Sequence, residues 1–161
     1  MKRLLPLIAV LVNVTMLPAA HADDSVFVRE PFLRLVWRAD LPAFCGSDRA
    51  QACTGFVGQR LDCSCERSGL AWQIRSHAQF FPVMYLPDVV WVAHERDHIG
   101  DIRQAVESHL LLLGLREFDS QSDCQAAAER EMAGFVKLMD QFKLDSNAAR
   151  HPRLAKLMRS R

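Results

Sequence analysis

The sequence predicts a single α+β domain in which N-terminal antiparallel strands precede two long antiparallel helices. Two observations support this prediction. Residues 60–85 show the alternation and the aromatic content of strands, and residues 89–143 contain two stretches with a helical period. Strands that come first, followed by helices, are typical of an α+β domain.

The strand prediction rests on side-chain alternation. Leu61, Cys63 and Cys65 alternate with polar residues, which is the pattern of a half-buried strand. After the turn at Gly69, residues 70–85 are rich in aromatic and β-branched side chains and have no helical period. We therefore expect one or two further strands there.

Two helices are expected in the second half of the chain. Pro87 and Asp88 resemble a helix start, because proline fits a first turn and a carboxylate is stabilised at the positive end of the helix dipole. A helical period then runs through residues 89–113 and closes at Gly114. A second helix is predicted over residues 123–143, with an apolar stripe along one side.

The N-terminus has the order of a secretory signal peptide. Lys2 and Arg3 precede an apolar run from Leu4 to Leu17, and Ala20-His21-Ala22 has the small-x-small form of a cleavage site. The run is short for a membrane span, and no later stretch reaches the necessary ~20 apolar residues. We expect cleavage after Ala22 and a single periplasmic or secreted domain over residues 23–161, without stable membrane insertion. A retained N-terminal anchor is the alternative.

Charge argues against two classes of partner. The chain has 20 basic and 19 acidic residues, and the predicted signal peptide removes two of the basic ones. A chain so close to neutrality gives no reason to expect nucleic acid or an anionic membrane as a partner.

The cysteine count indicates disulfides with one thiol left over. An exported chain can keep disulfides, and an odd number of cysteines leaves at least one unpaired. We expect Cys45 and Cys53 to pair first, because they close a short loop rich in Gly and Ser. A structural zinc site usually needs two C-x2-C pairs, which are absent. The five cysteines are Cys45, Cys53, Cys63, Cys65 and Cys124.

A metal-binding pattern lies within the first predicted helix. Residues 94–98 read His-Glu-Arg-Asp-His, which fits H-E-x-x-H. On a helix, His94 and His98 stand one turn apart on one face, so both imidazoles can bind one Zn²⁺. The alternative is that the pattern is a chance match among polar residues on a solvated helix and binds no metal.

The position of Glu95 around the helix separates these alternatives. At ~100° per residue, Glu95 falls on the same side as Ile99 and Ile102, whereas Arg96 and Asp97 fall on the polar side. An unpaired carboxylate is costly among apolar residues, so this placement favours a partly dry metal site. In such a site Zn²⁺ polarises a scissile carbonyl, and Glu95 acts as the general base towards water.

The chain resembles domain-of-unknown-function family 922, the predicted secreted zinc-dependent proteases of bacteria. The resemblance covers roughly residues 56–151 and includes the HERDHIGDI stretch and Cys124. In the tail, Asp145 matches the family pattern, the family's Tyr and Thr are absent, and His151 is one position late. The resemblance implies a zincin-like fold and a zinc peptidase that acts on peptides or proteins.

The register of the two helices narrows the choice of candidates for the third metal ligand. Glu129 and Glu131 are the candidates for a site whose third ligand is a glutamate on the second helix. If the helices form an antiparallel hairpin closed near residues 114–122, however, Glu131 lies ~13 Å along the axis from the motif. Asp145 or His151, both in the tail, is better placed to complete the site.

A rival function comes from a different class. The same residues suit a disulfide-stapled periplasmic interaction module in which a metal holds a helix without catalysis. Asp101 lies on the His94 face of the helix and is a candidate to orient a ligand histidine.

Overall fold

The computed structural model describes residues 25–37, 40–42, 45 and 52–152. The predicted signal peptide lies outside these residues. The elements follow in the order β1 (Val26–Val28), β2 (Phe32–Leu35), β3 (Cys53–Ser68), β4 (Ala71–Leu86), the 3-10 helix η3 (Val89–Trp91), α1 (Val92–Gly114), β5 (Glu117–Phe118) and α2 (Gln121–Arg150).

β3 and β4 form one long antiparallel hairpin. Their pairing runs from Cys53 opposite Tyr85 at the open end to Ser68 opposite Ala71 at the turn. Gly69 makes the turn possible, because its φ of 64° lies in the left-handed region, which is costly for other residues. The hairpin brings the first residues of β3 back beside the end of β4, just before α1 begins.

The other edge of β4 is covered by three short strands. β5 pairs with Trp72 and Gln73, β1 pairs with residues 78–80, and β2 pairs with residues 83–86. β5 is antiparallel to β4, whereas β1 and β2 are parallel to it. β4 is therefore the central strand of a mixed five-stranded sheet.

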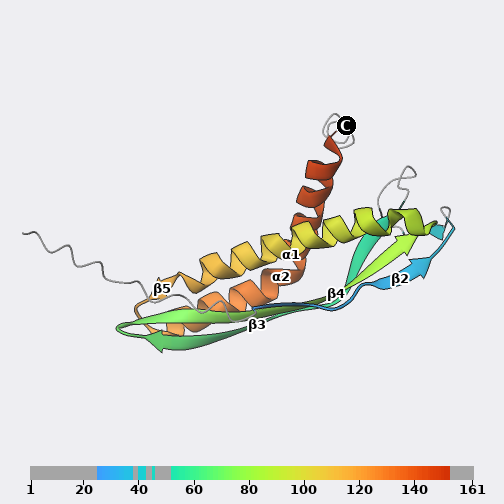
Figure 1. Cartoon of the computed structure of the whole chain (residues 1–161). Helices are drawn as coiled ribbons and strands as arrows, with labels where there is room; N and C mark the ends of the chain where they lie inside the picture. Colours follow the sequence, from blue (N-terminus) through green and yellow to red (C-terminus); the bar gives the residue numbers. More distant parts are fainter. Residues whose placement is uncertain (1–24, 38–39, 43–44, 46–51, 153–161) are drawn as a thin grey trace, which may run out of the picture.

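The predicted fold class is wrong. It was a zincin-like α+β domain with N-terminal antiparallel strands followed by two antiparallel helices. The two strands at the N-terminal end, β1 and β2, lie along the edge of β4 that β3 leaves free, and both run parallel to β4. The alternation on which the prediction rested does not determine strand direction, because parallel and antiparallel pairs both satisfy the backbone hydrogen bonds. β5 interrupts the helical half and joins the sheet. In Figure 1 the last turns of α2 turn away from the line of its first turns.

Both helices pack on one face of the sheet (Figure 1), α1 mainly over β4 and α2 mainly over β3. The apolar side of α1 supplies Ile102, Val106 and Leu110 to the shared core, where α2 supplies Phe135 and Met139. Burial of these side chains supplies most of the favourable free energy that holds the layers together. The motif lies in the first two turns of α1, beyond the centre of this core.

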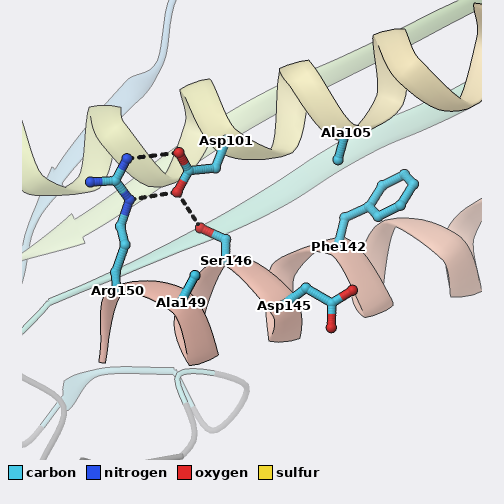
Figure 2. Close-up of a pocket in the computed structure, with 7 residues that line it drawn as sticks. All are labelled: Asp101, Ala105, Phe142, Asp145, Ser146, Ala149 and Arg150. Carbon is cyan, nitrogen blue, oxygen red and sulfur yellow. Dashed lines mark hydrogen bonds and ion pairs between the residues drawn. The ribbon is translucent and has the colours of Figure 1, made fainter. Parts of the chain in front are cut away.

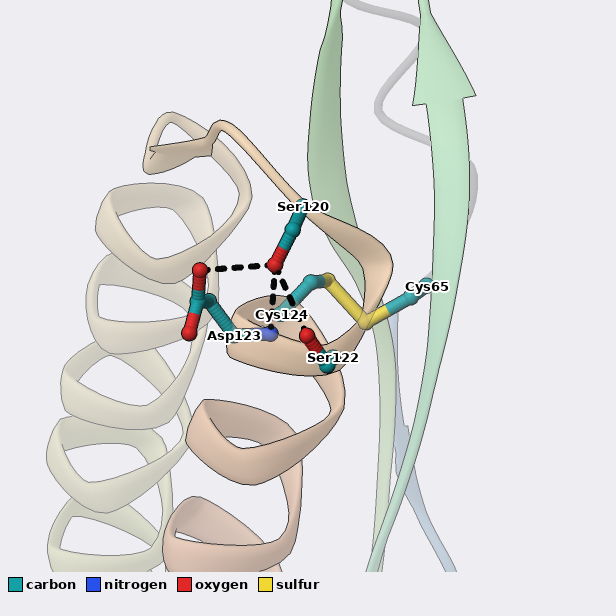
Figure 3. The surroundings of a disulfide bond; sticks show 5 residues. All are labelled: Cys65, Ser120, Ser122, Asp123 and Cys124. Atoms are coloured by element: carbon teal, nitrogen blue, oxygen red, sulfur yellow. Dashed lines mark hydrogen bonds between the residues drawn. A yellow bond between two sulfur atoms is a disulfide. The ribbon is translucent and has the colours of Figure 1, made fainter.

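The first turn of α2 is fixed twice (Figure 3). The Ser120 hydroxyl caps the helix by accepting a hydrogen bond from the Asp123 backbone N–H at 3.1 Å. One residue later, Cys124 forms a disulfide with Cys65 on β3, 59 residues earlier in the chain. The start of α2 is thereby linked covalently to the sheet.

The expected pairing of Cys45 with Cys53 is confirmed, and Cys63 is the free thiol among the described residues. Two disulfides indicate an extracellular or otherwise oxidising compartment. Within the described part of the chain, no helix combines the length and the apolar content needed to cross a membrane.

Candidate metal centre

Three histidines meet where the start of α1 lies beside the end of α2. His94 and His98 stand one turn apart on α1, and His151 is the residue that ends α2. The Nε2 atom of His94 lies 3.2 Å from that of His98 and 3.2 Å from that of His151. The Nε2 atoms of His98 and His151 are 3.3 Å apart. This group could hold a metal ion.

The spacing of these nitrogens fits a tetrahedral metal. Zinc–nitrogen bonds of about 2.0–2.1 Å at tetrahedral angles place ligand nitrogens about 3.3–3.4 Å apart. The three observed distances, 3.2, 3.2 and 3.3 Å, are close to that value. Three ring nitrogens would fill three corners of such a tetrahedron and would leave the fourth for water or a substrate.

The candidates for the third ligand are now separated in space. His151 is in the group, whereas the Asp145 carboxylate accepts a hydrogen bond from Gln141 on its own helix. Glu131 pairs with His109 and Arg116, well away from the motif.

The length of α2 explains the position of His151. The helix continues to Arg150, seven residues beyond the predicted end at Lys143. These additional turns bring Ser146, which is 6% exposed, and Arg150 alongside the first turns of α1.

A chain of polar contacts surrounds His98. Its Nδ1 lies 2.8 Å from the Ser146 hydroxyl, which donates a hydrogen bond of 2.9 Å to the Asp101 carboxylate. Arg150 binds both oxygens of Asp101 and also pairs with Asp97 at 3.0 Å (Figure 2 shows the Asp101 contacts). Asp101, Ser146 and Arg150 line a groove between the two helices.

The electrostatics keep His98 neutral. Burial, followed by the nearby His94, His151 and Arg150, lowers the pKa of His98 to about 4. The pKa of His151 is lowered as well, first by burial and then by His94. Neutral imidazoles have the free lone pair that a metal ligand needs, so both rings suit that role at neutral pH.

Glu95 lies on the buried side of α1, as its helical phase predicts, and is 3% exposed. The Thr54 hydroxyl on β3 donates a 2.8 Å hydrogen bond to its Oε2. Burial raises the pKa of Glu95, whereas the Thr54 hydrogen bond and the charge interaction with His151 lower it. A carboxylate with a raised pKa, close enough to His151 to interact with it electrostatically, can exchange a proton beside the histidine group.

Sequence reasoning missed Thr54, Ser146 and Arg150. Nothing around Thr54 marks it, because its contact with Glu95 spans 41 residues. For Ser146 and Arg150 the sequence has a weak signal, which is their spacing. They are four residues apart, so a helix extended past Lys143 would place both on one face.

When the chain is compared with protein families, curated proteins and solved structures, none matches it.

Proposed function

We propose that this protein is an exported zinc-dependent peptidase. The observation that supports this most is the convergence of three imidazole Nε2 atoms, all within 3.3 Å of one another, beside the buried carboxylate of Glu95. Its compartment is the periplasm or the cell exterior, in keeping with the two disulfides.

The donor set favours zinc. Imidazole nitrogen suits zinc, copper, iron and nickel, whereas calcium and magnesium prefer oxygen ligands. A tetrahedral arrangement of three protein ligands with one open position is typical of catalytic zinc, and structural zinc sites use four protein ligands. His94, His98 and His151 would hold the ion.

When bound, zinc polarises the scissile carbonyl and makes water a stronger acid. Glu95 would accept a proton from the water that attacks the carbonyl carbon. As the C–N bond breaks, Glu95 would deliver that proton to the leaving amine nitrogen. Thr54 would hold Oε2 of Glu95 during both transfers, which leaves Oε1 for the proton.

A second function is favoured by one specific feature. His151 is 57 residues from His94 and 53 from His98, so one ion at these residues would tie the end of α2 to α1. A metal that only ties two helices together defines the alternative, a disulfide-stapled interaction module without catalysis.

Two measurements separate the proposals. Purified protein should contain about one zinc per chain, and His94→Ala or His98→Ala should lose most of it. Glu95→Gln should keep the zinc and lose hydrolysis of a fluorogenic peptide mixture, because it removes a base and no ligand. Glu107→Gln, on the same helix but paired with Arg103, is the matched control and should keep both properties.

The outcomes distinguish the two functions. If the unmodified protein binds zinc but hydrolyses no peptide, the interaction module would be favoured over the peptidase. Hydrolysis by Glu95→Gln at the unmodified rate would rule out the assigned base, and unchanged zinc content in both histidine variants would rule out the site.

A further inference from the structure

We propose that Ser146 and Asp101 are positioning residues, which fix the tautomer of His98 so that its Nε2 lone pair points towards His94 and His151. This inference rests on the proposed metal site, and it assigns a role to residues outside the three ligands.

Only one assignment of hydrogen-bond donors and acceptors fits the contacts among Asp101, Ser146 and His98. Arg150 binds both carboxylate oxygens of Asp101, which keeps Asp101 ionised and able only to accept hydrogen bonds. The Ser146 hydroxyl has one proton, and it donates that proton to Asp101 at 2.9 Å. At its other contact, 2.8 Å from His98 Nδ1, Ser146 must therefore accept.

The tautomer of His98 follows from this step. Since Ser146 can only accept, the hydrogen of the neutral imidazole is on Nδ1. Nε2 then has the lone pair, and Nε2 is the atom 3.2 Å from His94 Nε2 and 3.3 Å from His151 Nε2. Without this network either tautomer would be available, and one of them would direct an N–H at the metal position.

The position of the network supports a role at the metal site. His98 and Ser146 are 5% and 6% exposed, so water competes little for their hydrogen bond. Arg150 precedes His151 directly, so its two contacts with the Asp101 carboxylate also hold the third imidazole near the first two.

Variants with matched controls test the role. Ser146→Ala removes the acceptor for His98, and Ser146→Thr keeps a hydroxyl there. Ser108→Ala, in which the lost hydroxyl donates a hydrogen bond to the Gln104 backbone carbonyl, controls for removal of a helix serine. Asp101→Ala frees the Ser146 proton, and Asp97→Ala removes a partner of Arg150 that Ser146 does not contact.

Two readouts are needed. Competition with a chelator measures zinc affinity, which should fall by roughly 10- to 100-fold in Ser146→Ala and Asp101→Ala. It should stay within about threefold in Ser146→Thr, Ser108→Ala and Asp97→Ala. Nitrogen NMR of the histidine rings, recorded in zinc-free protein at neutral pH, should show His98 with its hydrogen on Nδ1 in the unmodified chain and a mixture of tautomers in Ser146→Ala.

The results separate this inference from the proposed function. Unchanged zinc affinity in Ser146→Ala overturns the positioning role while leaving the zinc site intact. An equal loss in Ser146→Ala and Ser146→Thr also overturns it, because helix packing would then set the affinity. If the unmodified protein binds no zinc, the proposed function fails, and the NMR spectrum still decides the tautomer of His98.

Discussion

Thr54 on β3 and Glu95 on α1 are joined by a hydrogen bond of 2.8 Å between two nearly inaccessible side chains, 6% and 3% exposed. The sheet thus contacts the H-E-x-x-H segment at Glu95, the residue to which we assign acid–base chemistry. This contact leads to the first prediction.

Thr54→Val should move the acid limb of the peptidase pH profile to higher pH. The Thr54 hydrogen bond lowers the pKa of Glu95, so its loss raises that pKa further above the ordinary value. A general base must be deprotonated, and a higher pKa delays this as pH rises. The measurement is kcat/KM against pH, with Ser76→Ala on the neighbouring strand as the control. An acid limb that stays in place would contradict the prediction.

Removing the metal should loosen the contact between α1 and the end of α2. A chelator is expected to lower the melting temperature, because an ion that binds only the folded state at 100 times its Kd adds about 2.7 kcal/mol to the free energy of unfolding. His151→Ala should melt at the same temperature with or without chelator. Calorimetry checks this, and an equal chelator effect in both proteins would count against His151 as a ligand.

The two disulfides should differ in their contribution to stability. Cys65–Cys124 closes a separation of 59 residues and Cys45–Cys53 one of 8. Loop-closure entropy then predicts losses of about 4 kcal/mol for Cys65→Ala/Cys124→Ala and about 2.5 kcal/mol for Cys45→Ala/Cys53→Ala. Urea unfolding of both double variants measures the difference. Equal losses would show that entropy of the unfolded chain is not the dominant effect.

Cys63 should react slowly with alkylating reagents. Burial, with additional repulsion from Glu131 and Asp62, raises the pKa of the Cys63 thiol to about 11. Only the thiolate reacts, so iodoacetamide labelling at pH 8 should be about a hundredfold or more slower than for a free thiol. Unfolding in urea without reductant should restore the ordinary rate. Fast labelling of the folded protein would show that Cys63 is exposed and ionised.

Local patterns predicted part of the candidate metal centre. The phase of a regular helix was enough to place His94 and His98 one turn apart and Glu95 on the apolar side, where it is 3% exposed. The third member was left as Asp145 or His151. The apolar stripe of α2 fades after Phe142, and a fading stripe does not show whether the backbone stops or continues. The helix continues, and His151 ends it.

The direction of β1 and β2 could not be predicted from the sequence. β1 and β2 have three and four residues, and a strand that short has the same side-chain pattern whichever way it runs along its neighbour. The free edge of β4 accepts a strand in either direction, since β5 pairs antiparallel along it while β1 and β2 pair parallel. An antiparallel arrangement was assumed for all of the early strands, and for β1 and β2 it was wrong.

In the proposed zinc-bound protein, α2 would be held at its two ends by different chemistry. Cys124 and His151 are 27 residues apart, or roughly 40 Å along a helix axis. A reductant would act at one end of this helix, and a chelator would act at the other. In a cytosol that keeps thiols reduced, the first attachment would not form, whatever the supply of metal. Maturation would therefore depend on two separate supplies, an oxidant and a metal, and a compartment that lacks either would contain chains with α2 attached at one end only.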